Sequence, residues 1–342
     1  MATTQSLGTV SLGRSGPQVS AIGLGCMGMS EFYGPADRAQ SLAALERAEQ
    51  CGVNFLDTSD AYGVGANEEL LADFLAGPRR SRFVLATKFG VQRDPETGRP
   101  LGVRGDAEYV RQAADACLRR LGTDYIDLFY LHLPDPRTPI EVTVGAMAEL
   151  VQAGKVRHLG VSNLGAGQLR AAHAVHPIAA VQLEWSVFTR SVEEELVPTA
   201  AELGIGFVPY APLGRGFLTG AYTSTAGLAP NDYRQAIPRF NDPGNAAHNA
   251  GLVEVVDKIA AAHEATPAQV ALAWLIGRGA RYGGLAVVPI PGTKRAERVA
   301  ENAGAVRLSL TEAQIAQLDA LGAQVRGEAN PPMPRAVAQA RN

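Results

Sequence analysis

Residues 50–57 read Gln-Cys-Gly-Val-Asn-Phe-Leu-Asp, and they contain the pattern that decides the fold. They end a segment, residues 37–50, whose apolar residues Leu42, Leu45 and Ala48 recur at helical spacing. Gly52 then supplies a residue suited to the left-handed conformation that ends a helix. The apolar run that follows predicts a buried strand. The stretch therefore predicts a helix–glycine–strand unit in which Asp57 stands at the end of the strand.

This unit recurs along the chain without sequence identity. Helical patterns at residues 68–76, 106–120, 141–153 and 192–203 are each followed by a glycine within two residues. The strands are almost continuously apolar, which indicates a parallel sheet buried on both faces. The strand candidates are residues 21–25, 54–58, 83–88, 126–132, 156–162, 180–183, 207–210 and 286–290. Eight such units predict a (β/α)8 TIM barrel, with residues 1–342 forming a single domain.

Three further segments complete the predicted architecture. Residues 9–13 and 18–20, joined by a turn at 14–17, predict a β-hairpin that plugs the N-terminal end of the barrel. Two long polar connections follow the third and seventh strands, at residues 90–105 and 213–249, and the second is predicted to act as a lid. The tail from about residue 322 is predicted to be irregular.

Composition excludes several classes of function. The net charge of −3, the pI near 6.1 and the lack of a basic run argue against a nucleic-acid surface. We find no signal-peptide pattern and no apolar stretch long enough to cross a bilayer, so a cytoplasmic protein is expected. Cys26, Cys51 and Cys117 lack CxxC spacing and are interpreted as reduced thiols. His173 and His176 lie three residues apart without further ligands, so no metal site is predicted.

Three successive strands end in polar residues that can act together. Asp57, Lys88 and His132 occupy these ends, and Tyr62 follows the first of them. In a barrel of this type the strand C-termini line the active site. Pairing with Asp57 allows Lys88 to be buried, and we expect its ammonium to lower the pKa of Tyr62 so that Tyr62 acts as a general acid. His132 is expected to donate a hydrogen bond to a carbonyl oxygen. None of these groups is a reductant, so the chemistry requires a nicotinamide.

A second group of residues predicts where that cofactor binds. Thr293 is expected to begin the last barrel helix, whose free N–H groups would attract phosphate. Lys294, Arg295 and Arg298 add positive charge there, which favours NADP over NAD; the alternative is that they are solvated surface charges.

These motifs resemble those of the aldo-keto reductases, and the resemblance runs from about residue 7 to about residue 320. It is strongest with the bacterial and plant branch that includes perakine reductase-like enzymes. It implies NADPH-dependent reduction of aldehydes and ketones, with Asp57, Tyr62, Lys88 and His132 as the catalytic tetrad. It also implies that Ser162, Asn163 and Gln182 hold the nicotinamide carboxamide and that Tyr210 stacks on its ring. The remaining implied cofactor contacts are Ala211, Pro212, Leu213, Arg215, Gly292, Thr293, Lys294, Arg298, Glu301 and Asn302.

The substrate pocket is predicted from the loops after the first, third, fourth and sixth strands. Its walls are expected to be apolar and to lack a fixed cation, which favours aromatic or medium-length apolar aldehydes and some ketones. Leu133 and Trp185 differ from the residues common in relatives, so the substrates of relatives cannot be transferred. The predicted wall comprises Cys26, Met27, Met29, Tyr33, Phe89, Leu133, Trp185 and Phe188.

Three other functions make different demands on the sequence. The Gly-x-Gly-x-x-Gly pattern at residues 23–28 lacks the helix start and the acidic residue of a Rossmann unit. A Schiff-base aldolase would use Lys88 as its nucleophile. A slow NADP-binding protein, like the channel-associated β subunits of the same family, would keep the fold and the cofactor.

Overall fold

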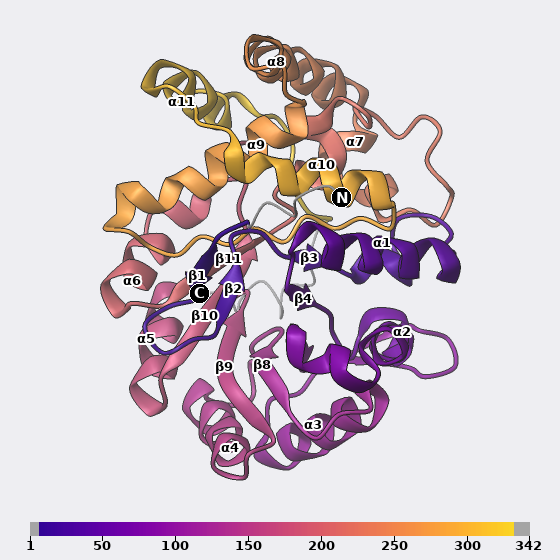
Figure 1. The fold of residues 1–342 in the computed structure, drawn as a ribbon, viewed down its shortest axis with the longest axis vertical. Coiled ribbons are helices and arrows are strands. Elements are labelled where there is room, and N and C mark those ends of the chain that lie inside the picture. The colour runs from indigo at the N-terminus through magenta and orange to yellow at the C-terminus, as the bar shows by residue number, and fades with distance from the viewer. Residues whose placement is uncertain (1–6, 332–342) are drawn as a thin grey trace.

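Seven parallel strands follow one another around a barrel in chain order (Figure 1). The structure, a computed structural model, describes residues 7–331. The strands are β3 Leu24–Gly25, β4 Phe55–Asp57, β5 Val84–Phe89, β8 Ile126–Leu131, β9 Val156–Ser162, β10 Ile178–Glu184 and β11 Gly206–Tyr210. Each coincides with a predicted strand to within three residues at either end.

The eighth position of the barrel is filled by residues 286–292, which form only isolated bridges and no regular strand. Val288 and Ile290 donate backbone hydrogen bonds to the carbonyls of Phe207 (2.9 Å) and Pro209 (3.1 Å) in β11. On the other side, Gly23 donates to the carbonyl of Pro289 at 2.9 Å. The barrel is therefore closed, and the (β/α)8 fold is confirmed. The predicted strand at 286–290 was wrong in detail because Pro289 and Pro291 have no N–H to give to a ladder.

Helices surround the barrel and follow its strands in order (Figure 1). Gly52, Gly122 and Gly204 are left-handed caps at the ends of α1, α3 and α6, as the glycine pattern predicts. The eight barrel helices within residues 7–331 are α1 Arg38–Cys51, α2 Ala66–Leu75, α3 Ala107–Leu121, α4 Ile140–Gln152, α5 Ala166–Val175, α6 Leu196–Leu203, α9 Pro267–Gly277 and α10 Ala296–Ala303.

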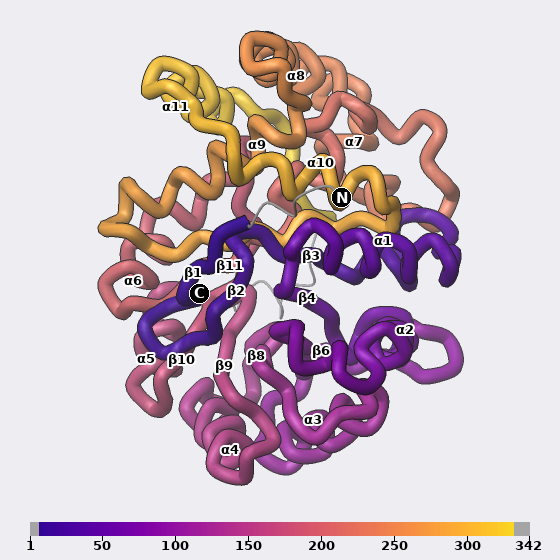
Figure 2. Tube along the Cα trace, in the orientation of Figure 1, coloured from indigo at the N-terminus to yellow at the C-terminus, as the bar shows by residue number. Residues whose placement is uncertain are grey.

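The predicted N-terminal plug is confirmed. Strands β1 Thr9–Ser11 and β2 Gln18–Ser20 form an antiparallel hairpin that lies across one end of the barrel (Figure 2). Leu12 and Val19 are fully buried and pack with the inward-facing side chains of the barrel strands. The turn lies so close to the barrel that a Cβ on Gly13 would be 2.5 Å from the carbonyl oxygen of Ala179. Glycine is therefore required at that position.

The two long connections are more regular than the sequence predicts. Residues 90–105 contain a hairpin, β6 Val91–Arg93 with β7 Pro100–Val103. The connection after β11 contains α7 Pro238–Asn241 and ends at α8 Pro243–Ala262, because Asp242 accepts a hydrogen bond from Asn245 N and caps that helix. After α11 Glu312–Asp319, residues 325–331 have neither helix nor strand, and the predicted tail beyond 331 lies outside the described residues. Among residues 7–331, no helix has the length and apolar character needed to span a membrane.

The alternation of strand side chains places the site. Phe55, Ala86, Leu128, Val208 and Val288 pack together inside the barrel. Side chains two residues further along each strand face the same way. The interior at the C-terminal end of the barrel therefore receives Asp57, Lys88, Tyr130 and Tyr210, while intervening residues pack against the helices.

Candidate active site

The predicted tetrad lies together at the C-terminal end of the barrel. Lys88 of β5 is fully buried, and its ammonium pairs with the carboxylate of Asp57 at the end of β4. Its Nζ also donates to the carbonyl of Thr58 at 2.8 Å and lies 3.4 Å from Tyr62 Oη. The rings of Tyr62 and His132 meet edge to face, with centroids 5.8 Å apart.

The environment of Tyr62 corrects one prediction. Burial, followed by the negative charge of Asp57, raises the pKa of Tyr62 well above its ordinary value, whereas a lowered pKa was predicted. The ammonium of Lys88 does not lower it because Asp57 already balances that charge. Tyr62 therefore remains a protonated phenol at neutral pH, and Lys88 can donate a hydrogen bond to its oxygen.

Asp57 has a second partner in Gln182 of β10. Gln182 Nε2 donates to Asp57 Oδ2 at 2.8 Å, and both side chains are almost completely buried. The sequence predicts Gln182 only as a cofactor contact. Its bond to Asp57 fixes the carboxylate that holds Lys88, so Gln182 also supports the tetrad.

His132 directly follows β8, and its backbone N–H donates to the backbone carbonyl of Phe89 at 2.8 Å. Burial and, to a lesser degree, the charge of Lys88 lower the pKa of His132 to about 3, so the ring is neutral at physiological pH. Its Nδ1 lies 3.1 Å from Ser59 Oγ, and Ser59 Oγ lies 3.2 Å from Asp60 Oδ1. The sequence prediction missed Ser59 and Asp60, although they stand between two of its catalytic residues.

Residues predicted to hold the nicotinamide form a continuous hydrogen-bonded group beside the tetrad. Ser162 Oγ donates to the carbonyl of Gln182 at 2.8 Å. Asn163 Nδ2 donates to Ser162 Oγ (2.9 Å) and to the carbonyl of His132 (3.1 Å). Tyr210 Oη donates to Asn163 Oδ1 at 3.0 Å. Asn163 has φ 57°, a left-handed conformation that concentrates at functional sites when the residue is not glycine.

The mouth of the barrel carries a charged group. Arg215 has φ 58° and pairs with Glu184 at 2.9 Å, while both side chains are largely buried. Arg215 also donates to Tyr33 Oη (3.3 Å) and to Asn330 Oδ1 (2.6 Å). The sequence prediction missed Glu184, although it lies two residues after Gln182 and therefore faces the same side of the strand. Ala211, with φ 47°, lies between Tyr210 and this group, and Pro212 and Leu213 continue toward Arg215.

The segment predicted to bind the adenosine end differs in its helix start. Helix α10 begins at Ala296 and not at Thr293, because Thr293 Oγ1 accepts from Arg295 N at 3.1 Å and forms a turn first. Lys294 Nζ donates to the carbonyl of Tyr33 at 2.9 Å. Two of the predicted cations form ion pairs with neighbouring acids, Arg295 with Glu297 and Arg298 with Glu301. Gly292 is exposed and Asn302 is buried on α10.

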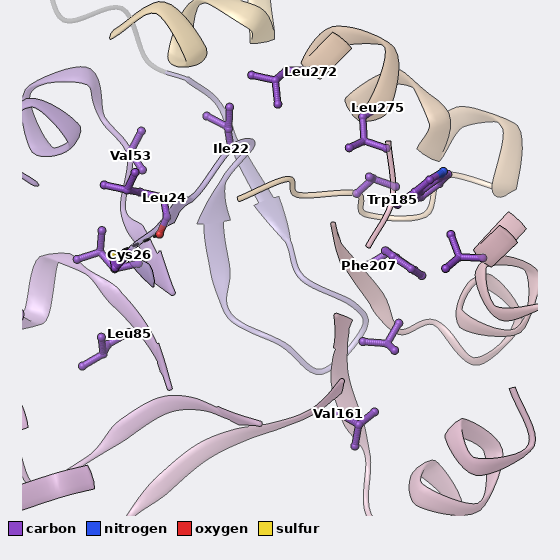
Figure 3. Packing of buried hydrophobic residues seen from close by; sticks show 14 of the residues in the cluster. Ile22, Leu24, Cys26, Val53, Leu85, Val161, Trp185, Phe207, Leu272 and Leu275 are labelled. Atoms are coloured by element: carbon purple, nitrogen blue, oxygen red, sulfur yellow. Dashed lines mark hydrogen bonds between the residues drawn. The ribbon is translucent and has the colours of Figure 1, made fainter. Parts of the chain in front are cut away.

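The predicted substrate wall is only partly correct in its placement. Trp185 is fully buried beside Phe207 and Tyr282, outside the barrel strands, and Figure 3 shows it among apolar side chains near Leu275. Phe89 is also fully buried, stacked on Phe129. The two predictions were wrong for the same reason. Phe89 follows Lys88 and Trp185 follows Glu184, and because both preceding residues face the barrel interior, Phe89 and Trp185 must face the helices.

The other predicted wall residues fall into two groups. Cys26, Met29 and Phe188 are buried in the core, although Cys26 lies beside the tetrad, where the charges of Asp57 and Lys88 act on its thiol. Met27, Tyr33 and Leu133 are partly exposed.

Comparison with known proteins gives concordant results. A profile of the aldo/keto reductase family matches residues 21–323. The chain is similar to a thermostable aldo-keto reductase solved with the inhibitor epalrestat, at 28% identity and a TM-score of 0.72, over 92% of this chain and 99% of that one. It is also similar to the glycerol dehydrogenase of Gluconobacter oxydans, at 26% identity and a TM-score of 0.81, over 98% and 99% of the two chains.

Proposed function

Because this chain belongs to the aldo/keto reductase family, we propose that it reduces aldehydes and ketones to alcohols with NADPH and uses Tyr62 as the general acid. The observation that supports this most directly is the contact between Lys88 Nζ, Asp57 and Tyr62 Oη next to a neutral His132. This arrangement presents two neutral hydrogen-bond donors, a phenol and an imidazole, to a carbonyl oxygen. We also propose the perakine reductase-like branch as its place in the family.

The residues at the barrel mouth are suited to a nicotinamide dinucleotide. Strained left-handed backbone occurs at Asn163, which Tyr210 contacts, and at Ala211 and Arg215 just after Tyr210. The residue Tyr210 is partly exposed and offers a ring on which a flat heterocycle can stack. When bound, the cofactor supplies the hydride that no side chain of this site can supply. We propose that Ser162, Asn163, Gln182, Tyr210, Ala211, Pro212, Leu213 and Arg215 hold its nicotinamide and pyrophosphate part, and Gly292, Thr293, Lys294, Arg298, Glu301 and Asn302 its adenosine part.

The preference for NADP rests on fewer free charges than the sequence suggests. Arg298 already pairs with Glu301, so Lys294 is the cation with no acidic partner within 4 Å among the described residues of this segment. A 2′-phosphate would compete with Glu301 for Arg298 and gain Lys294 as a second contact. We therefore propose a preference for NADP that depends mainly on Lys294.

Proton transfer is assigned to Tyr62. Its raised pKa keeps the proton on the phenol until a carbonyl oxygen develops negative charge. Lys88 then donates a hydrogen bond to the phenolate oxygen that forms, and Asp57 and Gln182 keep Lys88 in place. His132 orients the carbonyl oxygen.

The substrate class follows from the partly exposed wall residues. Met27, Tyr33 and Leu133 offer apolar contacts, and Arg215 is already neutralised by Glu184. We propose aromatic and medium-length apolar aldehydes, with some ketones, as substrates. Charged carbonyl compounds would have to break the pair between Arg215 and Glu184 to find a cation.

The structure gives no support to the aldolase alternative. A Schiff base requires a neutral amine with a free lone pair. Lys88 Nζ bonds to Asp57, to the Thr58 carbonyl and to Tyr62, which is the pattern of a fixed ammonium.

The deciding experiment is Tyr62→Phe with NADPH absorbance as the readout. Loss of the acid catalyst should lower kcat by about 10²–10⁴-fold. The dissociation constant for NADPH should change little, since the ring is retained. Retention of most of kcat would show that Tyr62 is not the acid.

A further inference from the structure

The loop between Asp57 and Tyr62 contains two polar residues to which the tetrad assigns no role. Ser59 is fully buried, and its hydroxyl has one proton and three acceptors within reach. These are His132 Nδ1 at 3.1 Å, Asp60 Oδ1 at 3.2 Å and the carbonyl of Lys88 at 3.4 Å. Ser59 Oγ also accepts a hydrogen bond from Ala61 N at 3.2 Å. The single proton cannot serve all acceptors, so its direction depends on the state of Asp60.

We propose that Ser59 and Asp60 form a relay that decides which nitrogen of His132 carries its proton. The relay rests on the proposed function, in which His132 donates from Nε2 to the carbonyl oxygen. No described residue bonds Nε2, which leaves that nitrogen to a ligand. Ser59 and Asp60 are thus positioning residues for the reduction.

With Asp60 neutral, every hydrogen bond points toward His132. The carboxylic O–H of Asp60 donates to Ser59 Oγ, and Ser59 donates to His132 Nδ1. Nδ1 must then be unprotonated, because it accepts this hydrogen bond. The proton of the neutral ring is on Nε2, from which it can be donated to a carbonyl oxygen. This is the active tautomer.

With Asp60 ionised, the chain reverses. The carboxylate accepts a hydrogen bond from the Ser59 hydroxyl, which keeps its proton, so Ser59 Oγ becomes the acceptor for His132 Nδ1–H. The ring proton has moved from Nε2 to Nδ1, and one proton has left Asp60 for solvent. His132 then presents a lone pair to the carbonyl oxygen, which it repels.

The surroundings of Asp60 place this change near neutral pH. Burial is the main cause that raises the pKa of Asp60 to about 8; the carboxylate of Glu68 on α2 also raises it, while Arg120 on α3 lowers it. Glu68 is paired with Arg120 at 2.6 Å, which limits the help that Arg120 gives to Asp60. Tyr109 and Cys117 of α3 are the other titratable groups nearby, and burial raises the pKa of both. Asp60 is therefore the group of this cluster that changes charge first above neutral pH.

The test reads the tautomer directly. In ¹⁵N-histidine-labelled enzyme without cofactor, the ring shifts of His132, assigned with His132→Gln, should change from the Nε2–H to the Nδ1–H pattern between about pH 6 and about pH 10. Asp60→Asn cannot ionise, so its ring shifts should keep the Nε2–H pattern throughout. In Ser59→Ala the ring shifts should no longer follow the ionisation of Asp60. Asp73→Asn, an exposed carboxylate paired with Arg38, is the matched control and should titrate like the wild type. A wild-type pattern that stays constant over this range, or one that changes equally in Asp60→Asn, would overturn the relay.

Activity gives a second readout. The kcat/KM of the wild type and of Asp73→Asn should fall about tenfold per pH unit above the ionisation of Asp60, and Asp60→Asn should lack this fall. Tyr62 does not produce it, because its pKa is raised far above this range. If no carbonyl compound is reduced at any pH, the proposed function fails while the ring shifts still decide on the relay. An identical alkaline fall in Asp60→Asn would contradict the relay.

Discussion

Removal of the ammonium from the tetrad by Lys88→Met should destabilise the whole protein. Lys88 is 0% and Asp57 2% exposed, so the variant leaves a buried carboxylate whose remaining donor is Gln182 Nε2 at 2.8 Å. Breaking a buried pair in this way costs about 3–5 kcal/mol of unfolding free energy, since the remaining charge is uncompensated. The double variant Asp57→Asn/Lys88→Met should recover most of this loss, because it removes both charges together.

The assay is urea unfolding followed by the fluorescence of Trp185 and Trp274, both of which are buried. Lys155→Met is the control, since Lys155 pairs with Asp115 at 2.6 Å but both side chains are more than 40% exposed. Loss of an exposed pair should cost only about 0–1 kcal/mol. If Lys88→Met cost no more than Lys155→Met, or if the double variant were worse than Lys88→Met, the argument from burial would be refuted.

Four further outcomes are expected. Lys294→Ala should weaken NADPH binding by about 1.5–3 kcal/mol and NADH binding much less, and Arg298→Ala should have a smaller effect on NADPH because Arg298 is paired with Glu301, measured by fluorescence titration; equal weakening of the two cofactors would contradict recognition of the 2′-phosphate. The connection at residues 213–242 should be protected from proteolysis by the cofactor, and a full primary deuterium isotope effect on kcat would show that release of NADP is not limiting. Trp185→Phe should lower stability while leaving the relative kcat/KM values for a set of carbonyl substrates unchanged, since the ring lies outside the barrel. A change in the order of these substrates would show that Trp185 does line the substrate pocket. Because the pKa of His132 is lowered to about 3, its ring signals should not titrate as an imidazolium between about pH 5 and pH 8, and protonation of the unfolded chain should reduce stability as the pH falls from about 6.5 toward 3.

The sequence was sufficient for the barrel and for the placement of the tetrad residues at its strand ends. Glycines after amphipathic helices and apolar strands that end in Asp57, Lys88 and His132 are local signals, and a closed barrel converts them into neighbours. The pKa of Tyr62 was predicted in the wrong direction because its value depends on how completely Asp57 neutralises Lys88, which only the packed structure shows.

Other errors have different physical origins. Trp185 was assigned to the pocket from its place after a strand, although strict alternation from Gln182 puts it on the helix side. Glu184 was missed for the same reason. The start of α10 was misplaced because a serine or threonine can cap a helix or form a turn, and the side chain of Thr293 forms a turn.

The closure of the barrel by a segment rich in proline has a consequence for how the molecule opens. Pro289 and Pro291 cannot donate, so the segment is held to the first strand by the amides of Gly23 (2.9 Å) and Gly25 (3.4 Å). Local unfolding should cost the least free energy where this segment meets β3. We therefore expect the amide of Gly25 to exchange with deuterium faster than those of β8 and β9. The proposed dinucleotide would contact residues on both sides of the junction with β11, from Tyr210 to Gly292. Binding would then fix this segment against β11, so that it separates from β3 less often, and slower exchange of the Gly25 amide would report that stabilisation.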